Sequence, residues 1–73
     1  MNKYITPDLP LAAFMIMRGV KLISAQKMSN GKFEFVLDDI DNKAQFLSID
    51  YVNSEFCKFD NQIRTLRKVL YTK

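Results

Sequence analysis

The sequence predicts a small α+β domain with elements in the order β-α-β-β-α-α, in which an antiparallel hairpin packs against helices. Three observations predict it: an apolar run bounded by helix start and stop signals, two β-rich segments joined by a Ser-Asn-Gly turn, and two later segments with helical periodicity. A chain of 73 residues that is 48% hydrophobic can form one core but not two. We therefore expect a single domain over residues 1–73.

The first predicted element is an extended segment over residues 1–6, followed by a helix over residues 8–18. Thr6 or Asp8 can cap the start of this helix, and Gly19 provides a left-handed stop just after its end. The residues between are apolar nearly all round the helix, a pattern that favours packing on more than one side. We expect this helix to be the central element of the core.

A pair of strands is predicted over residues 20–27 and 32–38. The first segment is rich in strand-forming residues, and the second alternates, with Phe33, Phe35 and Leu37 on one face. Residues 29–31 supply the turn, because Asn and Gly accept the positive φ that a tight hairpin needs.

Two helices are predicted in the second half of the chain. Asp39 or Asp41 can cap a helix that runs to about Val52, and one stripe of it should face the core: Ile40, Ala44, Leu47 and Tyr51. After a connector over residues 53–58, Asp60 is expected to cap a last helix that reaches about Thr72. The apolar side chains of that helix should turn inward: Phe59, Ile63, Leu66, Val69 and Leu70.

The residue types argue against an enzyme. No histidine and a single cysteine leave no ligand set for zinc or another transition metal, and no glycine-rich phosphate loop is present, so we expect no cofactor. The acidic cluster Asp38, Asp39 and Asp41 lies at a predicted helix start, where carboxylates are expected for capping; a divalent-ion site there is the weaker alternative. Lys58, the neighbour of Cys57, is alone a poor candidate to promote a thiolate, so we expect Cys57 to be a packing or surface thiol.

A set of short runs extends over nearly the whole chain: Tyr4-Ile5-Thr6-Pro7-Asp8-Leu9, Ala12-Ala13-Phe14, Gly19, Gly31, Phe33-Glu34-Phe35, Tyr51-Val52-Asn53 and the closing residues 66–71. With these runs the chain resembles a family of short uncharacterised bacteriophage and prophage proteins, a domain of unknown function. The resemblance implies a viral origin and a cytoplasmic location in the infected host cell, and it implies no activity. The chain departs from the family pattern at Asn53-Ser54, where relatives often have Asn-Gly, and at Pro7 and Pro10.

No membrane partner is expected from the sequence. The longest apolar run without a charge, residues 9–17, is shorter than the ~18 residues that a membrane-spanning helix needs.

The charge is uneven along the chain, and the basic end suggests a binding face. Residues 38–60 are acidic, whereas residues 61–73 carry only positive charges. On the last predicted helix, four side chains share an arc of about 100°: Arg64, Arg67, Lys68 and Tyr71. Arginines pair with phosphates and a tyrosine ring can stack on an unpaired base, so we interpret this arc, extended by Lys73, as a site for nucleic acid, single-stranded in particular, without sequence readout. The alternative is a solvated helix face with bases near its C-terminus.

A second hypothesis rests on surplus apolar residues. Phe46 and Ile49 fall outside the core stripe of their helix, at about 200° and 140° from Ala44. With Phe56 and Met28 they are either core residues or an exposed interface for a second copy or a host protein that the chain inhibits or redirects. A structural role in a virion is a third alternative.

Overall fold

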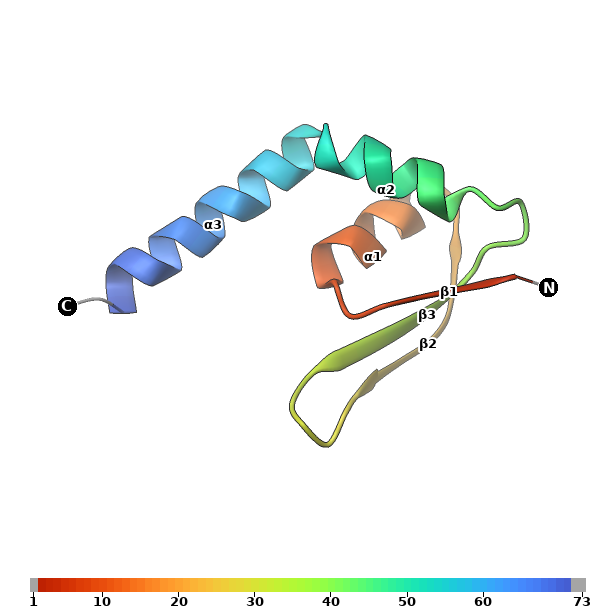
Figure 1. Ribbon diagram of the computed structural model, residues 1–73, viewed down its shortest axis with the longest axis horizontal. Coiled ribbons are helices and arrows are strands. Elements are labelled where there is room, and N and C mark those ends of the chain that lie inside the picture. The colour runs from red at the N-terminus through yellow and green to blue at the C-terminus, as the bar shows by residue number, and fades with distance from the viewer. Residues whose placement is uncertain (1, 72–73) are drawn as a thin grey trace.

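The structure, a computed structural model, describes residues 2–71. It confirms the predicted α+β fold and the order β-α-β-β-α-α (Figure 1). The elements are β1 (Lys3–Thr6), α1 (Leu9–Met17), β2 (Lys21–Lys27), β3 (Phe33–Asp38), α2 (Ala44–Val52) and α3 (Glu55–Tyr71). The parts of the predicted elements that fall on Met1 and Thr72 lie outside the described residues.

The helix α1 begins and ends where its local signals predict. The Asp8 carboxylate accepts a hydrogen bond of 3.1 Å from the backbone N–H of Leu11, and the Thr6 hydroxyl accepts one of 3.1 Å from the N–H of Asp8. Gly19 follows the helix with a φ of 97°, a conformation that glycine adopts without a steric penalty. The chain then turns directly into β2.

The three strands form one antiparallel sheet in the order β1-β3-β2. Tyr4, Leu37 and Leu22 lie level across the sheet, and the register between β2 and β3 shifts between Leu22 and Ser24. At the hairpin, Gly31 has a φ of 84°, and the Asn30 side chain accepts a hydrogen bond from the N–H of Lys32 at 3.0 Å. The predicted turn over residues 29–31 is therefore confirmed.

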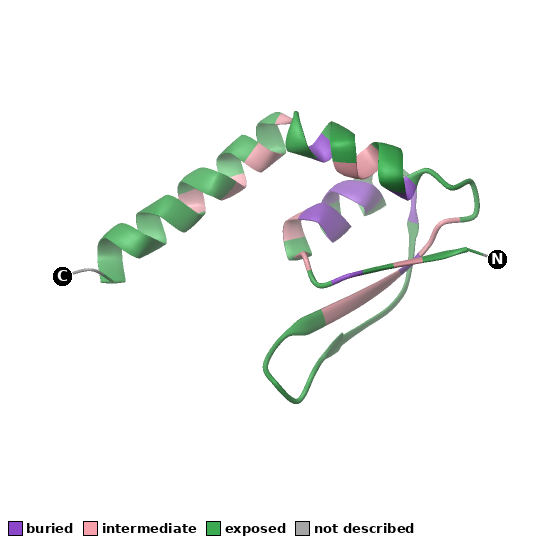
Figure 2. Cartoon of the chain, viewed as in Figure 1, coloured by how far each residue is buried: buried purple, intermediate pink, exposed green. Residues whose placement is uncertain are grey.

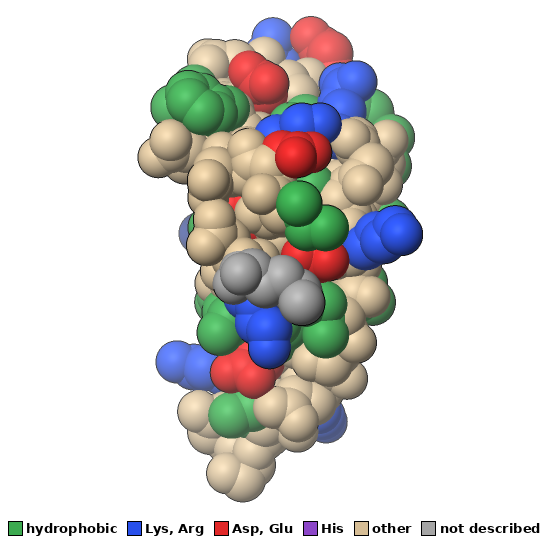
Figure 3. Space-filling view, turned by 90° about the vertical axis from the view of Figure 1, so that its right-hand side faces the viewer, with side chains coloured by type: hydrophobic (Ala, Val, Ile, Leu, Met, Phe, Trp, Pro, Cys, Tyr) green, Lys and Arg blue, Asp and Glu red, His purple; other side chains and the backbone are tan. Residues whose placement is uncertain are grey.

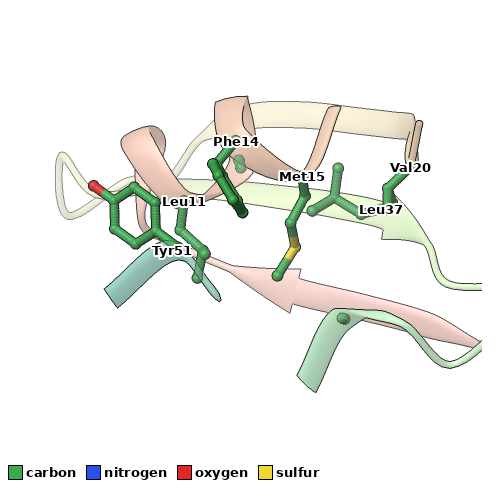
Figure 4. Close-up of a cluster of buried hydrophobic side chains, with 8 residues drawn as sticks. Leu11, Phe14, Met15, Val20, Leu37 and Tyr51 are labelled. Carbon is green, nitrogen blue, oxygen red and sulfur yellow. The ribbon is translucent and has the colours of Figure 1, made fainter. Parts of the chain in front are cut away.

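The core lies between α1, the sheet and α2, and its centre is α1 as predicted (Figure 4). Met15 and Leu37 are fully buried, and the ring of Phe14 meets Tyr51 of α2 edge-on at 5.5 Å between centroids. The buried apolar side chains are Leu11, Ala12, Phe14, Met15, Val20, Leu37, Ala44 and Tyr51. Phe35 packs against this cluster, while Phe33 at the hairpin end of β3 is half exposed, so the predicted apolar face of β3 is covered only in part.

The helix α2 starts later than its acidic residues predict. It begins at Ala44, and the Asp39 carboxylate reaches across the preceding turn to accept hydrogen bonds from the N–H groups of Lys43 (2.7 Å) and Ala44 (3.0 Å). Asp39 thus does the capping that the sequence predicts. Ile40 lies before the helix and is 64% exposed, so its predicted place on the buried stripe is wrong.

The start of α3 is the largest departure from the predicted elements. Residues 55–58 are not a connector but the first turn of α3, and Ser54 accepts a 3.2 Å hydrogen bond from the N–H of Cys57 at that end. Asp60 therefore lies inside the helix and does not cap it, and its carboxylate pairs instead with Arg64 one turn later. The link between α2 and α3 is reduced to Asn53 and Ser54.

Most of α3 projects from the rest of the molecule (Figures 1 and 2). None of its residues is buried. The radius of gyration is 13.8 Å, against about 11 Å for a compact chain of this length. The accessible surface is 5791 Å², about 1,100 Å² more than a compact monomer of 8.5 kDa presents. The fold therefore leaves a large amount of surface uncovered, along α3 and also along β2, all of whose residues are exposed.

Candidate interaction surface

The exposed apolar side of α3 is the most distinctive surface of the described chain. Five apolar side chains recur at alternating intervals of three and four residues, and we name them the α3 stripe: Phe56, Phe59, Ile63, Leu66 and Leu70. Phe59, Leu66 and Leu70 are 69%, 62% and 73% exposed. The expectation that the apolar face of this helix turns inward is wrong for Phe59, Leu66, Val69 and Leu70, because α3 leaves the body after its first turns. Ile63, which lines the groove beside α1, is half-buried.

At its beginning the α3 stripe borders a groove between α1 and α3. The groove has a volume of about 230 Å³, and its lining is mainly apolar: Pro10, Ala13, Phe14 and Met17 of α1, Tyr51 of α2, and Phe56, Phe59, Asp60 and Ile63 of α3. The Phe56 ring lies 5.8 Å from the Phe14 ring. The stripe and the groove therefore form one continuous apolar surface that combines α3 with the exposed flank of α1.

The basic arc predicted on the last helix lies on the surface of α3. Arg64, Arg67, Lys68 and Tyr71 are all exposed and follow one another at helical spacing. The Nε of Arg64 donates a 2.8 Å hydrogen bond to the carboxylate of Asp60, so this guanidinium is already engaged. Within residues 2–71, Arg67 and Lys68 form no ion pair. The predicted extension to Lys73 lies outside the described residues.

The predicted partner-interface residues are exposed but divide between two places. Phe46 and Ile49 are each 60% exposed and lie on the outer side of α2, opposite the buried Ala44 and Tyr51. Phe56 is 47% exposed and lines the groove beside α1. Met28, also proposed as surplus, is exposed at the hairpin.

Polar groups gather at the junction of α1, α2 and α3. Burial is the main cause that raises the pKa of Tyr51 above its usual value, followed by the negative charges of Asp60, Cys57 and Asp8, while Arg64 lowers it. Cys57 is half-buried against the core, and the Asn61 side-chain amide lies 3.8 Å from its sulfur. This arrangement keeps the Tyr51 phenol protonated and packed in the core, so we assign Tyr51 a structural role.

Two of the three carboxylates of the acidic cluster serve local structure, whereas one carboxylate oxygen of Asp38 is buried without a hydrogen-bond partner. Asp39 caps α2, and Asp41 forms a 3.7 Å ion pair with Lys43. Among residues 2–71, no group of three acidic or cysteine side chains is placed to hold a metal ion. On the face turned to the viewer in Figure 3, acidic and basic side chains are interspersed, with apolar side chains between them.

The comparisons with known proteins add a family but no activity. The helices within residues 2–71 fall short of the length and apolar character that crossing a membrane requires. No curated protein and no solved structure matches the chain. A family model described as a domain of unknown function, DUF5659, matches residues 1–72. The chain that carries this exposed stripe belongs to the DUF5659 family.

Proposed function

We propose that the protein is a protein-interaction module that binds an amphipathic helix of its partner on the α3 stripe. The observation that carries the proposal is the exposure of Phe59, Leu66 and Leu70, each more than 60% accessible, on one side of a projecting helix. Contiguous apolar patches of this kind on a small protein mark interaction sites. Intervals of three and four residues are the pattern with which one helix recognises another.

The groove beside α1 supports the same proposal. A helix laid along the α3 stripe would meet α1 at Met17 and Pro10, so that its end contacts two elements at once. Phe14, a core side chain, and Phe56, whose ring packs against it, both line the groove. Rigid aromatic side chains in a preformed hollow are typical of the residues that dominate binding energy at interfaces.

Site-specific photo-crosslinking in the producing cell tests the proposal. A photo-crosslinking amino acid at position 66 should give a discrete adduct, because Leu66 lies on the α3 stripe, whereas the same group at position 58 should not, because Lys58 lies off the stripe. The substitution Phe59→Asp should abolish the adduct. If no adduct forms at position 66, or if it survives Phe59→Asp, the proposal fails. Mass spectrometry of the adduct separates a second copy from another protein.

Nucleic-acid binding through the basic arc is the second candidate. It is favoured by one observation: Arg67 and Lys68 are exposed on α3 and have no ion-pair partner within residues 2–71. The Asp60 carboxylate on Arg64 weakens the candidate, because a phosphate would have to compete with it.

Fluorescence polarisation with labelled single-stranded and duplex oligonucleotides tests this candidate. Binding should weaken with salt, with a slope in log K of about −0.7 to −0.9 for each phosphate contacted. Arg67→Glu with Lys68→Glu should remove the binding. A single reversal away from α3, Lys43→Glu, should leave most of it, and Arg67→Glu alone should leave less than Lys43→Glu does. Binding that is independent of salt or of Arg67 and Lys68 rejects the candidate.

A bacteriophage origin and a cytoplasmic location are part of this proposal. Both rest on the resemblance of the sequence runs described above. A gene that lies among phage replication or host-takeover genes supports them, and a gene that lies in a conserved cellular operon contradicts them.

A further inference from the structure

We infer that the helix that covers the α3 stripe is α3 of a second copy, paired antiparallel about a two-fold axis. This inference rests on the interaction function proposed above and identifies its partner. Three properties of the described residues lead to it: the self-complementary spacing of the stripe, the distribution of charge along α3, and the amount of uncovered surface.

The spacing allows α3 to pack against itself. Placing the two-fold axis between residues 64 and 65 puts Ile63 beside Leu66 of the second copy and Phe59 beside Leu70 of the second copy. Four of the five side chains of the α3 stripe, Phe59, Ile63, Leu66 and Leu70, then meet another from the same set. Because Phe59 also lines the groove beside α1, this register brings Leu70 of the second copy to the edge of that groove.

The charges beside the stripe select the antiparallel direction. Asp60 lies four residues after Phe56, and Arg67 lies four residues after Ile63. The two side chains therefore occupy equivalent positions beside the stripe in successive seven-residue repeats. In an antiparallel pair, Asp60 faces Arg67 of the second copy. In a parallel pair, Asp60 faces Glu55 of the second copy, and the two negative charges repel.

The uncovered area has the size that a dimer needs. The chain presents about 1,100 Å² more accessible surface than a compact monomer of its mass. A stable protein interface buries about 800 Å² on each partner. An interface through α3 and the flank of α1 would therefore bury an area comparable to this surplus. A chain of this size also gains stability from association, because its own core is small.

Sedimentation equilibrium of the purified full chain tests the inference. The wild type should be a dimer with a dissociation constant in or below the micromolar range, about 1 μM. Leu66→Asp should raise the dissociation constant at least about 100-fold, because both copies lose a contact at the centre of the interface. Phe46→Asp, a matched change at a side chain of similar exposure on α2, should leave the dimer intact. Circular dichroism of each variant confirms that the monomer fold is retained.

One charge reversal distinguishes the two directions of pairing. Asp60→Lys should weaken the dimer about twofold to tenfold, because it places two positive charges together in the antiparallel pair, and Arg67→Glu in the same chain should restore it. In a parallel dimer, Asp60→Lys would strengthen association. Spin labels at position 71, in a Cys57→Ser and Tyr71→Cys chain, should lie about 20 Å apart along the axis in the antiparallel pair and side by side in the parallel one.

The outcomes separate this inference from the interaction function itself. A wild type that stays monomeric, or a dimer lost in Phe46→Asp but kept in Leu66→Asp, overturns the second-copy inference. If the adduct at position 66 in cells then contains another protein, the interaction function stands with a different partner. If the purified chain is monomeric and no adduct forms at position 66, both fail.

Discussion

The ring of Phe56 at the start of α3 lies 5.8 Å from the ring of Phe14 in the centre of the core, at an interplanar angle of 59°. Phe14 also meets Tyr51 and has the Arg18 guanidinium 4.9 Å above its ring centre. One buried side chain of α1 thus contacts both later helices. Phe14 is the point at which the projecting α3 is attached to the body.

Phe14→Ala should therefore destabilise the fold severely. Truncating a buried phenylalanine costs about 3–5 kcal/mol, and a chain of this length has a total free energy of unfolding of about 4–11 kcal/mol. Urea denaturation monitored by circular dichroism measures the loss. Phe46→Ala, at an exposed position, is the control and should cost less than about 0.5 kcal/mol. Equal costs for the two variants would mean that Phe14 is not the anchor described.

Asp8→Ala should remove the N-terminal cap of α1. Loss of the hydrogen bond from the Leu11 N–H to the Asp8 carboxylate should lower the free energy of unfolding by about 1 kcal/mol. Asp8→Asn keeps a capping oxygen and should recover most of that loss. Asp41→Ala removes an exposed carboxylate whose ion pair with Lys43 is long, and this matched control should have little effect. Midpoints of urea denaturation compare the four chains. A loss for Asp41→Ala as large as for Asp8→Ala would contradict the assigned cap.

The elements that sequence reasoning predicts correctly are those with local signals. The cap at Asp8, the positive φ at Gly19 and the Asn30-Gly31 turn each act within a few residues, so α1 and the hairpin have nearly the predicted bounds. The start of α3 is missed because Asp60 is also a good capping residue, although Ser54 followed by Glu55 is an equally valid start signal.

Exposure of the α3 stripe could not be predicted, because periodicity defines a face of a helix and not what covers it. The spacing of Phe59, Ile63 and Leu66 is the same for a helix packed on its own sheet and for one that awaits a partner. The direction that the chain takes at Asn53 and Ser54 decides which of these two helices forms. That direction depends on the packing of the whole fold and not on a local signal. Similarly, Arg64 and Arg67 lie on a helix as predicted, but the ion pair of Arg64 with Asp60 could not be predicted, because it requires Asp60 inside the helix and not at its start.

Stability should fall at alkaline pH because of Tyr51. Its pKa is raised in the folded state, mainly by burial and then by the nearby negative charges, so the folded state holds the phenolic proton more tightly than the unfolded state. The contribution is fully present below the unfolded pKa of about 10 and is lost as the pH rises through the folded value. Tyr51→Phe should remove this part of the pH dependence. Urea denaturation between neutral pH and strongly alkaline pH measures it, and an unchanged alkaline loss in Tyr51→Phe would assign the effect to other groups.

Hydrogen exchange should show that α3 depends on association for its stability. Alone, the second half of α3 has no buried side chain, so opening its backbone hydrogen bonds exposes little additional apolar surface and costs little free energy. We expect the amides of residues 64–71 to exchange much faster than those of α1 at low protein concentration, and to become protected as the concentration rises. Leu66→Asp should exchange rapidly at every concentration, and Phe46→Asp should behave as the wild type. Protection of residues 64–71 that is equal to that of α1 in a dilute sample would show that α3 is stable without a partner.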